Sequence, residues 1–197
     1  AEVEGAAGWL LGDWTHGPEL AAGLAVAISE AFEWYALPRW EEWLRSGLRV
    51  AEACGQRNLA RRQQRRLGWY LGQRGDVAQA RQFLEASLAA ARELLEEAVT
   101  DEDVEAGRRG VAVTLGDIAR LRADGGDVAG ALALHREALE VYEKLGDVRS
   151  QAVTQFDLAD LLRRQGEYAE AELLYRDCLD ISRRIGDAEG TLAVLAR

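Results

Sequence analysis

Three closely spaced arginines and a tryptophan are the residues of this 197-residue chain best suited to bind a ligand. Arg65 and Arg66 each stand three or four residues from Arg62 and from Trp69, which places the four side chains on one face of an α-helix. A guanidinium group donates two parallel hydrogen bonds to a carboxylate or a phosphate. The spacing therefore predicts a basic surface suited to an acidic peptide, a carboxylate terminus or a phosphate.

The residue types that catalysis and metal binding need are scarce. The chain has two histidines and two cysteines, with no HxxxH pair, no CxxC pair and no nucleophile elbow. His135 occupies a helical position that Tyr175 holds forty residues later, so we expect it to pack as an aromatic ring would. Cys54 and Cys178 stand at apolar helical positions, where we expect burial rather than a disulfide. We predict no catalytic residues, no metal site and no cofactor.

The charge balance restricts the classes of partner. The formal net charge is −10, which argues against a nucleic-acid-binding surface, although five arginines fall within Arg57–Arg66. No apolar run reaches the length of a membrane span and no signal peptide is present, so we expect a cytoplasmic protein without membrane contact. The chain lacks methionine and begins at Ala1, so we expect it to be a piece of a longer protein with further domains.

An internal repeat organises the second half of the chain. Fourteen residues are identical when residues 107–146 are aligned with residues 147–186. Each copy contains two apolar runs with helical spacing, separated by a glycine turn, and ends in a Gly-Asp pair such as Gly146-Asp147. A fixed period of this length is typical of stacked helical hairpins. Ala119 and Ala131 stand where the two helices of one hairpin are expected to approach most closely.

The repeat predicts one all-α domain of about four helix pairs, with partial repeats at both ends. The expected units are the end of a preceding repeat at 1–16 and then repeats at 17–55, 56–106, 107–146, 147–186 and the start of another at 187–197. The unit 56–106 contains eleven extra residues. We interpret them as longer helices, with Glu96–Val99 prolonging the second helix. Thr100 then begins the next helix with a sequence similar to a capping box.

The segment Leu67–Asp76, with sequence LGWYLGQRGD, resembles the first helix and turn of a tetratricopeptide repeat. Ala80, Ala131 and Ala171 fill the alanine position five residues after the turn glycine. The resemblance implies a right-handed α-α superhelix that recognises partners without catalysis, with the first helices lining a concave groove. The groove residues implied are Arg62, Arg65, Arg66, Trp69, Gln73, Asp117, Arg120, Phe156, Asp157 and Asp160.

An alternative interpretation gives several of these residues a structural role. Arg65 or Arg66 would pair with Asp117, and Arg120 would pair with Asp157 or Asp160, across neighbouring helices. The tryptophans raise a similar choice between packing and binding. We expect packing roles for Trp34, Trp40 and Trp43, and a position facing the groove for Trp69.

A narrower resemblance concerns the first repeat. The segments 20–25, 32–35 and Trp40-Glu41-Glu42-Trp43-Leu44 are similar to the first sensor repeats of bacterial signal-transduction ATPases with numerous domains. This resemblance implies a sensor for a protein, a peptide or a small effector, attached to a nucleotide-binding switch. The chain has no GxxxxGK[ST] loop, so the switch would lie elsewhere. The alternatives are a free-standing scaffold for complex assembly and the effector-binding part of a transcriptional regulator.

Overall fold

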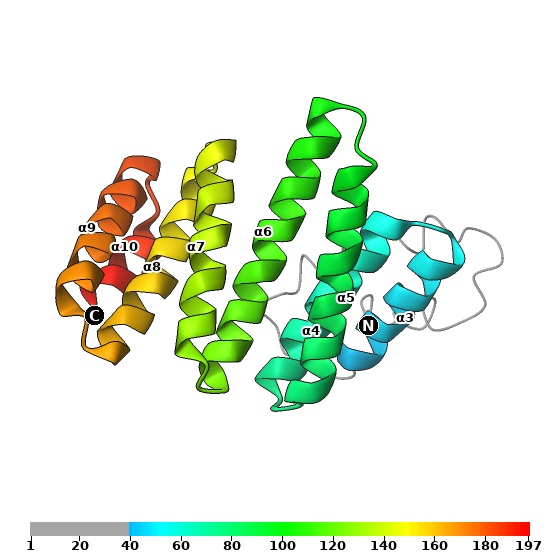
Figure 1. Ribbon diagram of the computed structural model, residues 1–197, viewed down its shortest axis with the longest axis horizontal. Coiled ribbons are helices and arrows are strands. Elements are labelled where there is room, and N and C mark those ends of the chain that lie inside the picture. Colours follow the sequence, from blue (N-terminus) through cyan, green and yellow to red (C-terminus); the bar gives the residue numbers. More distant parts are fainter. Residues whose placement is uncertain (1–39) are drawn as a thin grey trace, which may run out of the picture. The chain divides into compact units, whose positions relative to one another are not determined.

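The structure is a computed structural model that describes residues 40–197, and all regular structure in this part of the chain is α-helical. These residues fall into two compact units that meet in sequence between Glu96 and Glu97. Consecutive helices run antiparallel within each unit (Figure 1). The first unit holds α3 (Trp40–Ala53), α4 (Arg57–Gln73) and α5 (Val77–Glu96); the second holds α6 (Asp101–Asp124), α7 (Val128–Leu145), α8 (Val148–Gln165), α9 (Tyr168–Ile185) and α10 (Ala188–Leu195). The predicted all-α helical-repeat fold is confirmed for the described residues.

The Gly-Asp pairs end one helix and begin the next, as the sequence predicts. Gly146 and Gly186 take left-handed backbone conformations with φ of 65° and 72°, which glycine adopts without steric cost. Asp147 then caps α8, because its carboxylate accepts a hydrogen bond of 3.2 Å from the Ser150 backbone N–H. Asp187 caps α10 in the same way. These signals fix the helix boundaries of the second unit.

The eleven extra residues of the unit 56–106 lengthen α5 and α6. α5 has 20 residues and α6 has 24, against 18 in each of α7, α8 and α9. The predicted cap is confirmed, since Thr100 Oγ1 accepts a 3.1 Å hydrogen bond from the Asp103 backbone N–H. The prediction that the helix continues through Val99 is wrong, because α5 ends at Glu96 and Val99 is 92% exposed. Two features end α5 before Val99. Glutamates at a helix C-terminus interact unfavourably with the helix dipole. Thr100 must also adopt an extended backbone to cap the N-terminus of α6.

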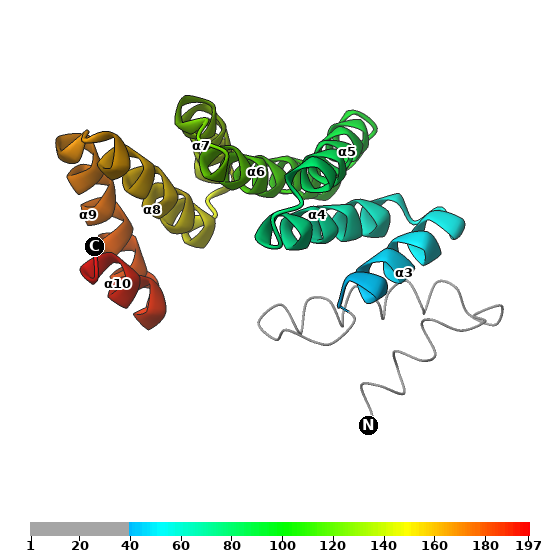
Figure 2. The same ribbon diagram turned by 90° about the horizontal axis from the view of Figure 1, so that it is seen from below.

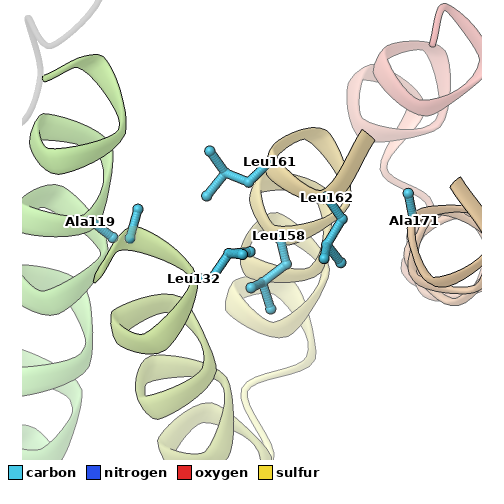
Figure 3. Close-up of a cluster of buried hydrophobic side chains, with 7 residues drawn as sticks. Ala119, Leu132, Leu158, Leu161, Leu162 and Ala171 are labelled. Atoms are coloured by element: carbon cyan, nitrogen blue, oxygen red, sulfur yellow. The ribbon is translucent and has the colours of Figure 1, made fainter. Parts of the chain in front are cut away.

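The core of the second unit joins hairpins that are forty residues apart in sequence. Leu132 of α7 packs with Leu158 and Leu161 of α8 (Figure 3). Ala119 and Ala131 have no exposed surface, which confirms the predicted close approach of α6 and α7. Each buried leucine contributes about 1.5–3 kcal/mol to the free energy of unfolding. The full cluster consists of Ala119, Ala131, Leu132, Leu158, Leu161, Leu162 and Ala171.

In the first unit, α4 and α5 approach closely at a glycine. A Cβ atom placed on Gly68 would lie 2.7 Å from Leu84 Cγ and 3.0 Å from the carbonyl oxygen of Ala80. The backbone of α4 is therefore as near to α5 as a residue without a side chain permits. Trp40 is buried and Trp43 is half-buried, so the predicted packing role of Trp40 is confirmed.

Some expectations fall on residues that the structure does not describe. The end of a preceding repeat expected at 1–16, the first part of the repeat expected at 17–55 and the packing of Trp34 lie outside residues 40–197. Among the helices that are described, none combines the length and the apolar composition that crossing a bilayer requires.

Candidate functional site

The five candidate residues of the first unit lie on one face of α4. Trp69 is 38% exposed and Gln73 is exposed, whereas Arg62, Arg65 and Arg66 are half-buried. We call these five residues the α4 surface. A helix face that carries arginines and an exposed indole ring can bond an anionic group while it packs against an apolar one.

The arginines of α4 place like charges close together. Burial and the neighbouring charge of Arg65 lower the pKa of Arg62 and of Arg61. Arg61 is 8% exposed and donates a 3.0 Å hydrogen bond to Asn58 Oδ1. The sequence of α4 contains five arginines and no acidic residue. The electrostatic potential produced by this helix therefore favours an anionic ligand.

In the second unit, Arg120 bridges two helices. Its Nη2 atom lies 2.7 Å from Asp157 Oδ2 of α8, and its Nη1 atom lies 3.1 Å from Asp117 Oδ1 of its own helix. Burial opposes the charge of Arg120, but the two carboxylates raise its pKa. Asp117 is only 5% exposed, so this pairing compensates a buried charge. The alternative interpretation of the sequence is confirmed for the pair Arg120–Asp157.

Asp160 is the acceptor of a second network. Arg163 and Arg164 of the same helix each place an Nη2 atom 2.9 Å from its carboxylate oxygens. The hydroxyl of Tyr175 on α9 donates to it at 3.3 Å, and Arg197 Nε lies 3.6 Å away. Burial opposes its ionisation, but the hydrogen bond from Arg163 and the nearby arginine charges lower the pKa of Asp160. Asp160 is therefore held as a carboxylate.

Phe156 lies beside the same network. Its ring meets the ring of Tyr175 edge to face, with centroids 5.8 Å apart. The guanidinium carbon of Arg197 lies 5.5 Å from the Phe156 ring centroid. The five candidate residues of the second unit thus belong to a network around Arg120 and a network around Asp160.

Sequence reasoning did not select Tyr175 or Arg197 for this site. An alignment of the repeats at intervals of forty residues could have selected Arg197. It aligns with Asp157, and Asp157 aligns with Asp117. The proposed pairing of Arg65 or Arg66 with Asp117 stays a prediction.

His135 lies next to the Arg120 network, and its packing role is confirmed. It is 1% exposed, and its Nδ1 atom has no hydrogen-bond partner. Burial lowers the pKa of His135; the charge of Arg120 also lowers it, while Asp157 and Asp117 act in the opposite direction. The folded protein therefore holds a neutral imidazole at this position.

Stability is expected to fall as the pH drops below about 6.5, where the unfolded chain begins to protonate His135 but the folded protein does not. The midpoint of thermal unfolding should be lower at pH 5 than at pH 7.5, and His135→Phe should remove most of that difference. The control is His16→Gln, which changes the other histidine of the chain. An unchanged pH dependence in His135→Phe would contradict the assignment.

Residues 40–197 contain no cluster of three or more His, Cys, Asp or Glu side chains placed to hold a metal ion. Cys54 and Cys178 are both free cysteines. Burial raises the pKa of the Cys178 thiol, which keeps it protonated and unreactive.

Comparisons with known proteins agree with this architecture. Two family models, each described as tetratricopeptide repeat, match residues 110–184 and residues 62–101. The crystal structure of BtubC (BKLC) from P. vanneervenii is similar in fold, with a TM-score of 0.67 over 90% of this chain and 69% of that chain, at 16% sequence identity. None of the curated proteins matches the chain. Because the two matched regions together span more than half of its residues, the chain belongs to the tetratricopeptide repeat family.

Proposed function

We propose that this protein recognises an acidic protein or peptide partner through the α4 surface, without catalysing a reaction. Tetratricopeptide repeats are protein-interaction modules, which supports recognition in general. The observation that carries the proposal is the exposure of Trp69 beside half-buried arginines on a helix that has no acidic residue. Aromatic and arginine side chains contribute most to binding energy at protein interfaces.

The α4 surface differs in charge from the corresponding residues of the second unit, because α4 carries five arginines and no acidic residue. Arg120 already binds two carboxylates, and Asp160 already accepts from several donors. A partner that binds these groups would have to replace contacts that connect neighbouring helices. The Arg120 and Asp160 networks therefore connect neighbouring helices, and we assign recognition to α4 because all of its charged side chains have one sign.

Removing side chains from the α4 surface is expected to weaken partner binding. Peptides selected on the protein by phage display should be rich in Asp and Glu, and their affinity should fall as salt increases. Arg66→Ala and Trp69→Ala should each lower the affinity for a selected peptide about tenfold, which is about 1.4 kcal/mol. Fluorescence anisotropy measures the affinity, and far-UV circular dichroism verifies that the helices persist.

Arg81→Ala is the matched control, because Arg81 lies on α5 and its side chain is 70% exposed. Its affinity for the same peptide should equal that of the unchanged protein. Normal binding by a folded triple variant of Arg62→Ala, Arg66→Ala and Trp69→Ala would contradict the placement on α4.

The wider role is that of a sensor in a multidomain bacterial signalling ATPase. The sequence Trp40–Leu44, similar to the first repeats of such sensors, supports this role. Partner binding would act on the nucleotide switch only if the partner has different affinities for two states of the protein. Two measurements test this: whether the parent gene encodes a nucleotide-binding domain, and whether a selected peptide changes its rate of ATP hydrolysis. A parent gene without that domain, or an unchanged rate, would contradict the sensor role.

A further inference from the structure

Arg61 carries a buried positive charge in the first unit. The helix that contains it, α4, packs against both α3 and α5 (Figure 2), and Arg61 is only 8% exposed. The Oγ atom of Ser87 on α5 donates a 3.0 Å hydrogen bond to the carbonyl oxygen of Arg61. The backbone at Arg61 is therefore held against α5.

No carboxylate in the described part of the chain forms an ion pair with Arg61. Its Nε and Nη2 atoms both donate to one neutral acceptor, Asn58 Oδ1, at 3.3 and 3.0 Å. Nη1 and the second N–H of Nη2 form the outer edge of the guanidinium group, and among the residues that the structure describes this edge has no acceptor. Such an edge can bond a carboxylate through two parallel hydrogen bonds.

The repeat fold does not require an arginine at this position. Arg61 aligns with Ala112 and Ala152 of the later repeats, which are 0% and 5% exposed. A small apolar side chain therefore satisfies the packing here. Burying a charge without a counter-ion destabilises a folded protein, so the arginine indicates a role other than packing.

The neighbours of Arg61 show on which side of α4 its guanidinium group lies. Asn58 stands three residues before Arg61 and four before Arg62, and Arg65 stands four residues after Arg61, so these residues share one side of the helix. Arg61 hydrogen-bonds Asn58, and burial together with the nearby charge of Arg65 lowers the pKa of Arg61. Arg61 therefore lies at the N-terminal end of the α4 surface.

We propose that Arg61 binds a carboxylate of the acidic partner and thereby determines the preference of the α4 surface for an anionic group. The partner's carboxylate supplies the counter-ion that the described residues do not, and Asn58 holds the guanidinium group in place for it. The partly desolvated position of Arg61 strengthens such a charge-assisted hydrogen bond. This inference rests on the proposed function, because it assigns a further residue to recognition through α4.

Arg61→Met tests this role with an apolar side chain of similar length. It should weaken binding of a phage-selected acidic peptide about tenfold, measured by fluorescence anisotropy. The midpoint of urea unfolding, followed by tryptophan fluorescence, should not fall, because the variant no longer buries an uncompensated charge. Arg61→Lys keeps the charge but lacks the planar fork, so it should recover part of the affinity.

A double-mutant cycle identifies the carboxylate that Arg61 binds. Each Asp or Glu of the peptide is changed in turn to Asn or Gln. One of these changes should weaken binding to the unchanged protein about tenfold and have little further effect in Arg61→Met. Arg81→Met is the matched control, because it removes one positive charge from α5 of the same unit, where the side chain is 70% exposed. It should leave both the affinity and the coupling unchanged.

Three results would overturn the inference: unchanged affinity in Arg61→Met, weaker binding accompanied by a lower unfolding midpoint, or no peptide carboxylate coupled to Arg61 in the cycle. Trp69→Ala distinguishes this failure from failure of the proposed function. If Trp69→Ala weakens binding and Arg61→Met does not, recognition through α4 stands and only the role of Arg61 is wrong. If neither variant weakens binding, the placement of the partner on α4 is wrong as well.

Discussion

Gly68→Ala is expected to destabilise the first unit by about 1–3 kcal/mol, as overpacking of a tight helix contact does. The added Cβ would lie 2.7 Å from Leu84 Cγ and 3.0 Å from the backbone carbonyl oxygen of Ala80. The leucine can rotate, but the carbonyl oxygen can move only if α5 moves. All six tryptophans precede residue 70, so tryptophan fluorescence during urea unfolding reports on this unit.

Gly116→Ala is the matched control for this substitution. Gly116 also lies inside a helix, and a Cβ placed on it meets no atom within 4 Å. Alanine should therefore stabilise α6 by about 0.5–1 kcal/mol through its better helix propensity, measured by circular dichroism. A Gly68→Ala protein as stable as the unchanged protein would mean that α4 and α5 are farther apart than described.

Arg120→Ala is expected to destabilise the second unit by about 1–3 kcal/mol. The loss is smaller than the 3–5 kcal/mol typical of fully buried pairs, because the Arg120 side chain is 42% exposed. The substitution leaves the buried carboxylate of Asp117 and the carboxylate of Asp157 without their shared cation. Urea unfolding followed by circular dichroism measures the change.

Two further variants identify the cause of this loss. Arg122→Ala, two residues away in the same helix, removes only an exposed pair with Asp127 and should change stability by less than about 0.5 kcal/mol. Adding Asp117→Asn and Asp157→Asn to Arg120→Ala should recover part of the lost stability, because no uncompensated charge remains. Equal losses in Arg120→Ala and Arg122→Ala would refute the bridging role.

The sequence predicts much of the fold because local signals decide the helix boundaries. Gly146 ends α7 and Asp147 caps the N-terminus of α8, both through contacts within a few residues. Thr100 caps the N-terminus of α6 in the same way as Asp147. The end of α5 was harder to predict. Val99 has an apolar side chain that suits a helix face, but glutamates and the following cap end the helix three residues earlier.

Pairing between helices could be predicted only in part. From spacing, Arg120 can reach either Asp157 or Asp160, which are one helical turn apart. The structure selects Asp157, since Asp160 is already bound by Arg163 and Arg164. This selection depends on the rotation of α8 about its axis, which the sequence pattern does not determine to within one turn.

One feature depends on tertiary distances and was not predictable. Gly68 aligns with Ala119 and Ala159 in the later repeats, so the sequence predicts a small residue at this position. It does not show that α5 lies too close for even the Cβ atom of an alanine. By contrast, the grouping of Arg62, Arg65, Arg66 and Trp69 on one face follows directly from helical spacing.

Photo-crosslinking from α4 tests most directly whether the partner binds there. A photoreactive phenylalanine derivative replaces Trp69 in one protein and Leu173 in another; Leu173 is 60% exposed and lies on α9 of the second unit. With an acidic peptide selected by phage display, we predict a crosslink from position 69 and none from position 173. A crosslink from position 173 alone, or none from position 69 under conditions where the peptide is bound, would contradict recognition through α4.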